Sequence, residues 1–166
     1  MDPLCNAVFR KIDEQIERTT HLVGLLPADR LGWQPPVPGG WTPGALLGHL
    51  LECLAGFCAV LYAVESDRLR HFGDLRHLPV NHFCRAEEVC VRIGQYRDHI
   101  RQGFELLQDA ALERSVPTIF TDQGENVLTL LLGNLEHLVN HKHQLFMYLR
   151  LLGVNVGTRD LYCFRG

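Results

Sequence analysis

Apolar side chains recur every three or four residues along four long stretches of the chain. In the first, from Leu4 to Leu26, they occupy one face of a helical repeat while charged residues occupy the other. This spacing is typical of an amphipathic helix that buries one side. Pro27 ends the stretch, and residues 28–41 contain three prolines and three glycines, which predicts an irregular loop.

The second stretch, Pro43 to Val64, is apolar almost all round, which predicts the most buried helix of the set. Thr42 before a proline is a helix start, because the hydroxyl caps and proline is tolerated at the first helical position. The stretch is long enough to cross a bilayer, but His49 and Glu52 lie inside it, and an acidic side chain at that depth is costly. We therefore expect a buried bundle helix and no membrane partner.

The remaining two stretches predict a third helix from Arg85 to about Leu112 and a fourth from Val127 to Gly153. Residues 65–84 form a connection of about twenty residues, which is long for a compact domain and favours a crossover that makes the second and third helices parallel. Residues 115–125 are predicted to be a loop. Together the four stretches predict an all-α four-helix bundle of up-down-down-up order, formed as a single domain over residues 1–166.

The composition adds limits on partners and location. Hydrophobic residues make up 46% of the chain and charged residues 21%, as in an ordinary soluble protein. The net charge is -3 and no basic patch stands out, so no nucleic-acid partner is expected. The six cysteines include no Cys-x-x-Cys pair, and the N-terminal segment lacks the apolar core of a secretory leader. We expect a cytoplasmic protein whose thiols act as small buried hydrophobes rather than as zinc ligands.

The sharpest chemical signal lies in the fourth stretch. His137 and His141 stand four residues apart, an advance of about 400° and about 6 Å, so both imidazoles project from one helix face and can reach one divalent ion. Gln144 and Tyr148 continue this face, whereas His143 is turned away by about 200° and is expected to point outward. The alternative is that the spacing arises by chance among nine histidines and that Gln144 and Tyr148 are packing residues.

Four other histidines differ in their surroundings. His49 lies inside the buried second helix and therefore needs a polar partner. His71, His77 and His82 lie in the long connection without a partner at metal-binding spacing, so we expect them to be solvated. If the second and fourth helices are antiparallel, His49 lies about two turns from the histidine pair of the fourth helix. A shared site therefore requires that the two helices be staggered.

Two segments resemble the signature stretches of the DinB-like (DinB/YfiT) superfamily of metal-dependent four-helix bundles. They are WTPGALLGHLLE in the second helix and HLVNHKHQLFMYLRLLG in the fourth. The resemblance implies a divalent metal held by three histidines, one from the second helix and two from the fourth. Carried over residue by residue, these ligands fall on His49, His137 and His141. Where family members often have His-Arg-Gly-Gln, this chain has His-Lys-His-Gln, so a substrate contact by the arginine does not carry over.

The resemblance also implies a function. Three neutral imidazoles leave a coordination position open, which is the catalytic pattern for zinc and also suits nickel. We expect one divalent metal, zinc or nickel, and an enzyme that joins a cellular low-molecular-weight thiol to a small electrophile, or a hydrolase-like relative of such an enzyme. Gln144 and Glu52 would hydrogen-bond the metal-binding histidines, Tyr148 would form a pocket wall, and the chain would form a homodimer. The alternatives are a non-catalytic metal-binding or stress-induced bundle that acts as a sensor or interaction module, and a metal-free bundle.

Overall fold

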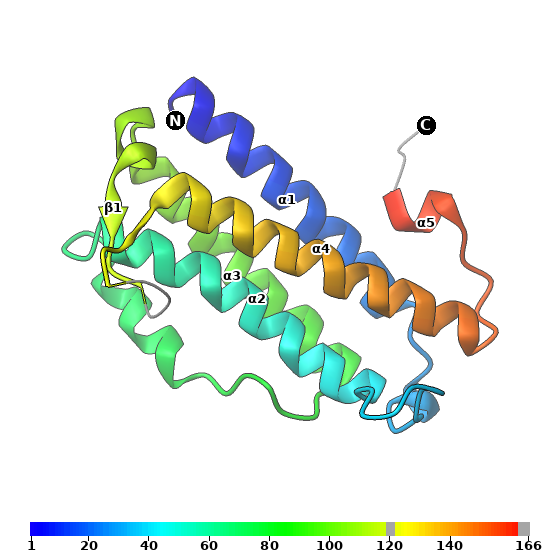
Figure 1. Ribbon diagram of the computed structural model, residues 1–166. Coiled ribbons are helices and arrows are strands. Elements are labelled where there is room, and N and C mark those ends of the chain that lie inside the picture. Colours follow the sequence, from blue (N-terminus) through cyan, green and yellow to red (C-terminus); the bar gives the residue numbers. More distant parts are fainter. Residues whose placement is uncertain (119–121, 163–166) are drawn as a thin grey trace.

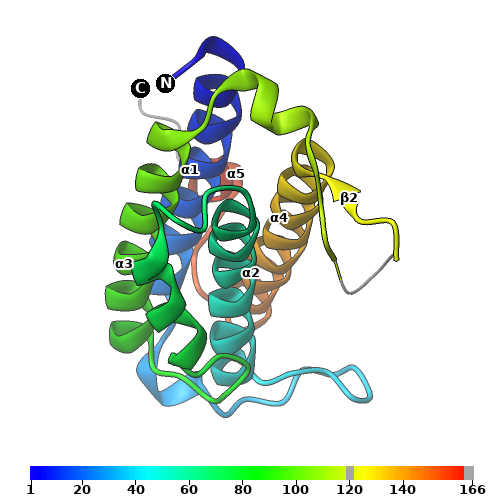
Figure 2. The same ribbon diagram turned by 90° about the vertical axis from the view of Figure 1, so that its left-hand side faces the viewer.

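Four long helices build the fold in the computed structural model of the chain, which describes residues 1–118 and 122–162. They are α1 (Pro3–Gly24), α2 (Pro43–Val64), α3 (Ala86–Leu106) and α4 (Val127–Leu151). Helices α2 and α3 run in one direction while α1 and α4 run in the other (Figures 1 and 2). This arrangement confirms the all-α, up-down-down-up prediction.

Shorter elements connect the long helices. The 3₁₀ helices are η1 (Ala28–Arg30), η2 (Arg70–His77) and η3 (Asp109–Glu113). The strands β1 (Ser115–Val116) and β2 (Glu125–Asn126) pair antiparallel, and α5 (Thr158–Tyr162) follows α4. The predicted loop 115–125 is therefore closed by a strand pair, and its residues 119–121 lie outside the described part of the chain.

Helix α2 is the core helix and has the predicted bounds. The Thr42 hydroxyl accepts a hydrogen bond from the backbone N–H of Ala45 at 3.2 Å, which is the expected cap. Among the described residues α2 alone is long and apolar enough to cross a membrane, and 67% of its most apolar window is buried inside the bundle. Its apolar surface contacts α3 and α4, so packing within the bundle accounts for its composition.

Helix α3 ends six residues before the predicted end. Leu107 is extended, with φ -76° and ψ 144°, and the chain then turns into η3. This turn brings the Asp109 carboxylate to the start of α1, where it accepts hydrogen bonds from the N–H groups of Leu4 at 3.1 Å and Cys5 at 2.8 Å. A carboxylate at a helix N-terminus pairs with free N–H groups and the helix dipole, which favours the turn over a longer helix.

The end of the crossover packs closely on the first turns of α2. The N–H of Asn81 donates to the carbonyl of Gly48 at 3.1 Å, and the N–H of Cys84 donates to the carbonyl of Gly44 at 3.0 Å. A Cβ atom at Gly48 would lie 1.8 Å from the carbonyl oxygen of His82, so only glycine permits this approach. The backbone of residues 81–84 is therefore fixed against α2.

Helix α4 projects beyond the first turn of α2 (Figure 1). Its projecting part is covered by the connection between α1 and α2, where the Trp33 ring packs edge-on against Tyr148 with 5.6 Å between ring centroids. This stagger places the middle of α4 level with the second turn of α2. The condition for a shared histidine site is thus met.

Candidate metal centre

Three imidazole rings meet where the second turn of α2 faces the middle of α4. The Nε2 atoms of His49 and His137 lie 3.0 Å apart. The His141 ring lies 4.4 Å from the His49 ring and 4.8 Å from the His137 ring, measured between centroids. The structure therefore brings together the three histidines on which the sequence resemblance places a metal.

The neighbours of His49 favour one tautomer of its ring. Its Nδ1 atom lies 2.7 Å from the Asn81 amide oxygen and 2.9 Å from a Glu52 carboxylate oxygen. Both neighbours are acceptors, so Nδ1 carries the proton and Nε2 presents its lone pair to His137. Metal-binding histidines commonly have this arrangement, in which an acceptor at one nitrogen orients the other nitrogen toward the ion. The predicted contact of Glu52 is present.

His141 is oriented in the same way by residues of its own helix. Its Nδ1 atom lies 3.0 Å from the Gln144 amide oxygen, and the Gln144 amide nitrogen donates to the Tyr148 hydroxyl at 2.8 Å. An acceptor at Nδ1 again leaves the lone pair on Nε2. The polar stripe predicted on α4 thus forms one hydrogen-bonded chain that fixes the ring of His141.

The electrostatics keep two of the imidazoles neutral. Burial lowers the pKa of His137 below its usual 6.5, and the nearby His49 acts in the same direction. Burial also lowers the pKa of His141, against a hydrogen bond to Gln144 that favours the charged form. Only a neutral imidazole can bind a metal, so both rings are in the ligating form at pH 7.

Cys53 lies one turn beyond His49 and is 1% exposed. Its sulfur and one nitrogen each of His49 and His137 all lie within 4.8 Å of one another, so the group could hold a metal ion. Burial raises the pKa of this thiol to about 12, and the Glu52 charge adds to the effect. The cysteine pattern predicts buried, non-ligating thiols throughout, although the four-residue spacing of Cys53 from His49 is a usable signal for a ligand.

The donor atoms fit a divalent metal cofactor. Two ligands bound at about 2.0 to 2.1 Å to a tetrahedral ion stand about 3.3 Å apart, close to the 3.0 Å between the Nε2 atoms of His49 and His137. The Cys53 sulfur lies within 4.8 Å of one nitrogen atom of each of these two histidines, and the His141 ring lies beside both of their rings. Nitrogen and sulfur donors of this kind suit zinc and nickel.

Two adjoining cavities open beside the cluster. One has a volume of about 410 Å³ and is lined by Glu52, Asn134 and His137 together with mostly small and apolar residues of α2, α4, β1 and the two residues after β1. The other, of about 310 Å³, lies between α2 and η2 and shares Glu52, Gly56 and Ala59 with the first. Trp41 packs on the rings of His49, at 4.4 Å, and His141, at 5.5 Å, and is itself 41% exposed. A small molecule therefore has space next to the histidines.

Most of the other histidines lie as predicted. His143 is exposed on α4, and His71 and His77 are exposed in η2. The prediction for His82 is wrong, because its side chain is only 34% exposed and contacts two other potential metal ligands. The crossover folds back on α2 and α3, which the sequence pattern of the connection did not indicate.

Lys142 stands where the resemblance leads us to expect an arginine. Its side chain is buried, and its Nζ atom donates to the Gln15 amide oxygen at 2.8 Å and to the Leu161 carbonyl at 3.5 Å. These contacts join α4 to α1 and α5. The residue therefore has a role in packing the helices together.

Comparisons with known proteins agree with this fold. A family model described as the DinB superfamily matches residues 11–145. The crystal structure of the DinB-like protein YjoA from Bacillus subtilis is similar, with a TM-score of 0.66 and 18% sequence identity over 89% of this chain and 92% of that chain. At this identity the likeness shows the fold alone. No curated protein sequence matches the chain.

Proposed function

This chain belongs to the DinB superfamily, and from its histidine cluster we propose that it is an enzyme that depends on a divalent metal held by His49, His137 and His141. The observation that carries the proposal is the approach of the Nε2 atoms of His49 and His137, with the His141 ring beside both. Each of His49 and His141 has an acceptor at Nδ1 that leaves the lone pair of the ring on Nε2. Zinc or nickel is the proposed metal.

The proposed reaction joins a low-molecular-weight thiol to a small electrophile. The thiol loses its proton to solvent and a sulfur–carbon bond forms. Either a leaving group departs as an anion, or an epoxide carbon–oxygen bond breaks and its oxygen takes up a proton. When bound, the metal supplies a positive charge that lowers the pKa of a coordinated thiol or water. The nearby Cys53 is a poor nucleophile for this reaction, because burial raises its pKa to about 12. The reacting sulfur is therefore assigned to a cosubstrate.

Space for both reactants supports this assignment. The cavities of about 410 Å³ and about 310 Å³ meet at Glu52, and His137 lines the larger one. Their walls are mostly apolar, which suits the body of a small electrophile. Glu52 contacts the His49 ring and also borders both cavities. It therefore orients His49, a proposed metal ligand, at the edge of the cavities where the substrate would bind.

Turnover assays with untagged protein test the proposal. Zinc, nickel or manganese is added, and monochlorobimane or an epoxide is offered with a panel of cellular thiols. We expect metal-dependent turnover that falls at least about 100-fold in His137→Ala, because one ligand is lost. His143→Ala is the matched control, since His143 is exposed on the same helix, and it should keep full activity. Stoichiometric metal without turnover for any thiol would instead favour a metal carrier or sensor.

A further inference from the structure

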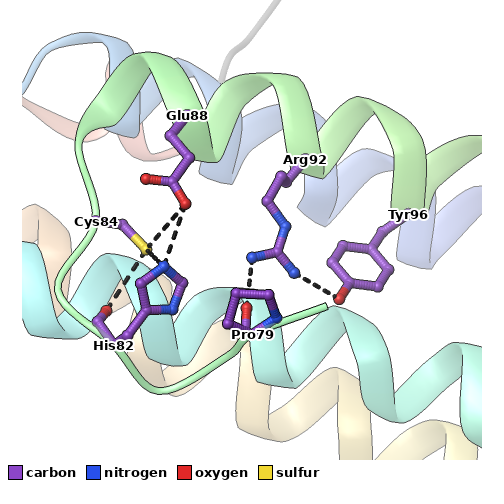
Figure 3. Close-up of polar contacts among 6 residues, drawn as sticks. All are labelled: Pro79, His82, Cys84, Glu88, Arg92 and Tyr96. Atoms are coloured by element: carbon purple, nitrogen blue, oxygen red, sulfur yellow. Dashed lines mark hydrogen bonds and ion pairs between the residues drawn. The ribbon is translucent and has the colours of Figure 1, made fainter. Parts of the chain in front are cut away.

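A second group of potential ligands lies outside the three-histidine cluster. His82 and Cys84 at the end of the crossover and Glu88 in the first turn of α3 point toward one another (Figure 3). The His82 Nε2 atom lies 3.2 Å from the Cys84 sulfur and 3.2 Å from a Glu88 carboxylate oxygen, and the sulfur lies 3.9 Å from that oxygen. We call these three residues the His82 cluster.

We propose that the His82 cluster binds a second divalent cation, with zinc as the preferred ion. Its three distances define a triangle whose circumscribed circle has a radius of about 2.0 Å, so one ion can stand about 2.0 Å from every donor. If the ion lies slightly outside the plane of the three donors, its distances to them lengthen toward a zinc–sulfur bond length of about 2.3 Å. Imidazole, thiolate and carboxylate are the three side-chain ligands that zinc uses in proteins.

Long hydrogen bonds link this cluster, in which the Cys84 thiol donates to the His82 carbonyl at 3.5 Å and to the Glu88 carboxylate at 3.9 Å. One nitrogen atom, His82 Nε2, faces both the Cys84 sulfur and the Glu88 carboxylate, and a single N–H cannot point at both with good geometry. The other ring nitrogen, Nδ1, is buried and has no hydrogen-bond partner among the described residues. The ring is therefore oriented through Nε2. A cation at the common point of the three donors satisfies all of them at once.

The surrounding backbone holds the His82 cluster in place. The N–H groups of Asn81 and Cys84 donate to carbonyls of α2 on both sides of His82. The Arg92 guanidinium, on α3, donates to the Pro79 carbonyl and to the Tyr96 hydroxyl (Figure 3). Such fixing from outside the ligand set is what a preformed metal site requires.

Solvent can supply the remaining ligand. Glu88 lines a cavity of about 500 Å³ together with Arg85, Glu87 and residues of η1 and its flank. Cys84 is fully buried, whereas the side chains of His82 and Glu88 are 34% and 44% exposed. The cluster thus combines a buried sulfur with an open side through which an ion can enter.

Cobalt(II) titration of untagged, metal-stripped protein tests the proposal, because cobalt bound to a thiolate absorbs in the near ultraviolet. We expect two ions per chain and, in the Cys53→Ser background, a thiolate-to-cobalt band that disappears on Cys84→Ser with the loss of one ion. Glu88→Gln, at an exposed position, should weaken this second site about tenfold or more while the circular dichroism and thermal unfolding stay unchanged. Elemental analysis of the zinc-loaded protein should give the same stoichiometries.

Two cysteine controls make the test specific. Cys90→Ser removes a thiol of α3 that lies outside the His82 cluster. It should leave the thiolate-to-cobalt band and the number of bound ions unchanged. Cys53→Ser removes the thiol next to His49 and should leave the band in place. The proposal is overturned if Cys53→Ser shows no band, if the variant with both Cys53→Ser and Cys84→Ser keeps it, or if Glu88→Gln binds the second ion as tightly as the wild type. Turnover is not part of these measurements, so failure of the proposed function leaves their outcome unaffected.

Discussion

A single amide oxygen, that of Asn81, helps to decide which nitrogen of His49 carries the proton. Asn81→Ala should lower the affinity of the three-histidine cluster for zinc about 10- to 100-fold, because Nδ1 loses its closest acceptor and the ring loses its orientation. Zinc affinity can be measured by competition with a chromophoric chelator. Asn140→Ala, at an exposed position of α4, serves as the control and should bind zinc normally. An unchanged affinity in Asn81→Ala would show that Glu52 alone orients the ring.

The third donor of the first site can be identified by comparing two variants. His141→Ala should weaken zinc binding about 100-fold, whereas Cys53→Ser should change it by less than about threefold, if the imidazole is the ligand. The same chelator competition measures both variants. The opposite ranking would assign the metal to His49, Cys53 and His137, which also have the required proximity.

Sequence reasoning at the residue scale succeeded where both partners lie on one helix. The link from His141 through Gln144 to Tyr148 follows from helical spacing and is present. The contacts of Asn81 and His82 could not be predicted, because they depend on the path of the crossover in space rather than on any spacing along the chain. Local periodicity carries no information about such a path.

At the scale of elements, the contact between the crossover and α2 depends on a missing side chain. Gly48→Ala should displace residues 81–84, because its Cβ would overlap the His82 carbonyl oxygen. We expect weaker zinc binding at His49 and a lower free energy of unfolding, measured by chelator competition and urea denaturation. Gly94→Ala is the matched control, since nothing lies within 4 Å of its Cβ in α3, and it should stabilise the protein by about 0.5 to 1 kcal/mol. Equal stability of the two variants would contradict this account.

The bounds of the elements were predictable to different degrees. Both ends of α2 were predicted correctly, since Thr42 and Pro43 fix its start by a local cap. The end of α3 was placed too late, because buried Leu107 and Leu112 continue the apolar spacing although the chain has already left the helix. Short elements such as α5 contain too few residues to show a period.

For the whole molecule, acid stability should depend in part on a salt bridge between α1 and α3. The Arg97 guanidinium donates to the Asp13 carboxylate, with one contact of 2.8 Å, and this hydrogen bond holds the pKa of Asp13 below its usual 3.8. A folded-state pKa below the unfolded value adds stability above pH 3.8, and this stability is lost as the pH falls through the lower folded value. Asp13→Asn should therefore lower the Tm at pH 6. It should leave the Tm unchanged at a pH low enough to protonate Asp13 fully in the folded wild type.

Thermal unfolding from pH 6 down to pH 2, followed by circular dichroism, measures this difference. Asp122→Asn, at an exposed loop position, is the control and should follow the wild type over the whole range. If the Tm of Asp13→Asn stays below that of the wild type even at the lowest pH, the variant has lost packing rather than a charge interaction. The homodimer implied by the resemblance and the cytoplasmic location expected from the cysteine pattern and the N-terminal segment stay predictions, and light scattering after size-exclusion chromatography tests the first.

The position of Trp41 against the rings of His49 and His141 gives the protein an intrinsic fluorescent probe. Nickel or cobalt bound within a few ångströms of an indole quenches its emission, so the fluorescence of Trp41 should fall as the three-histidine cluster fills. The chain has one other indole, Trp33, and Trp33→Phe would isolate the signal. Occupancy of this site can thus be followed in real time without any attached dye.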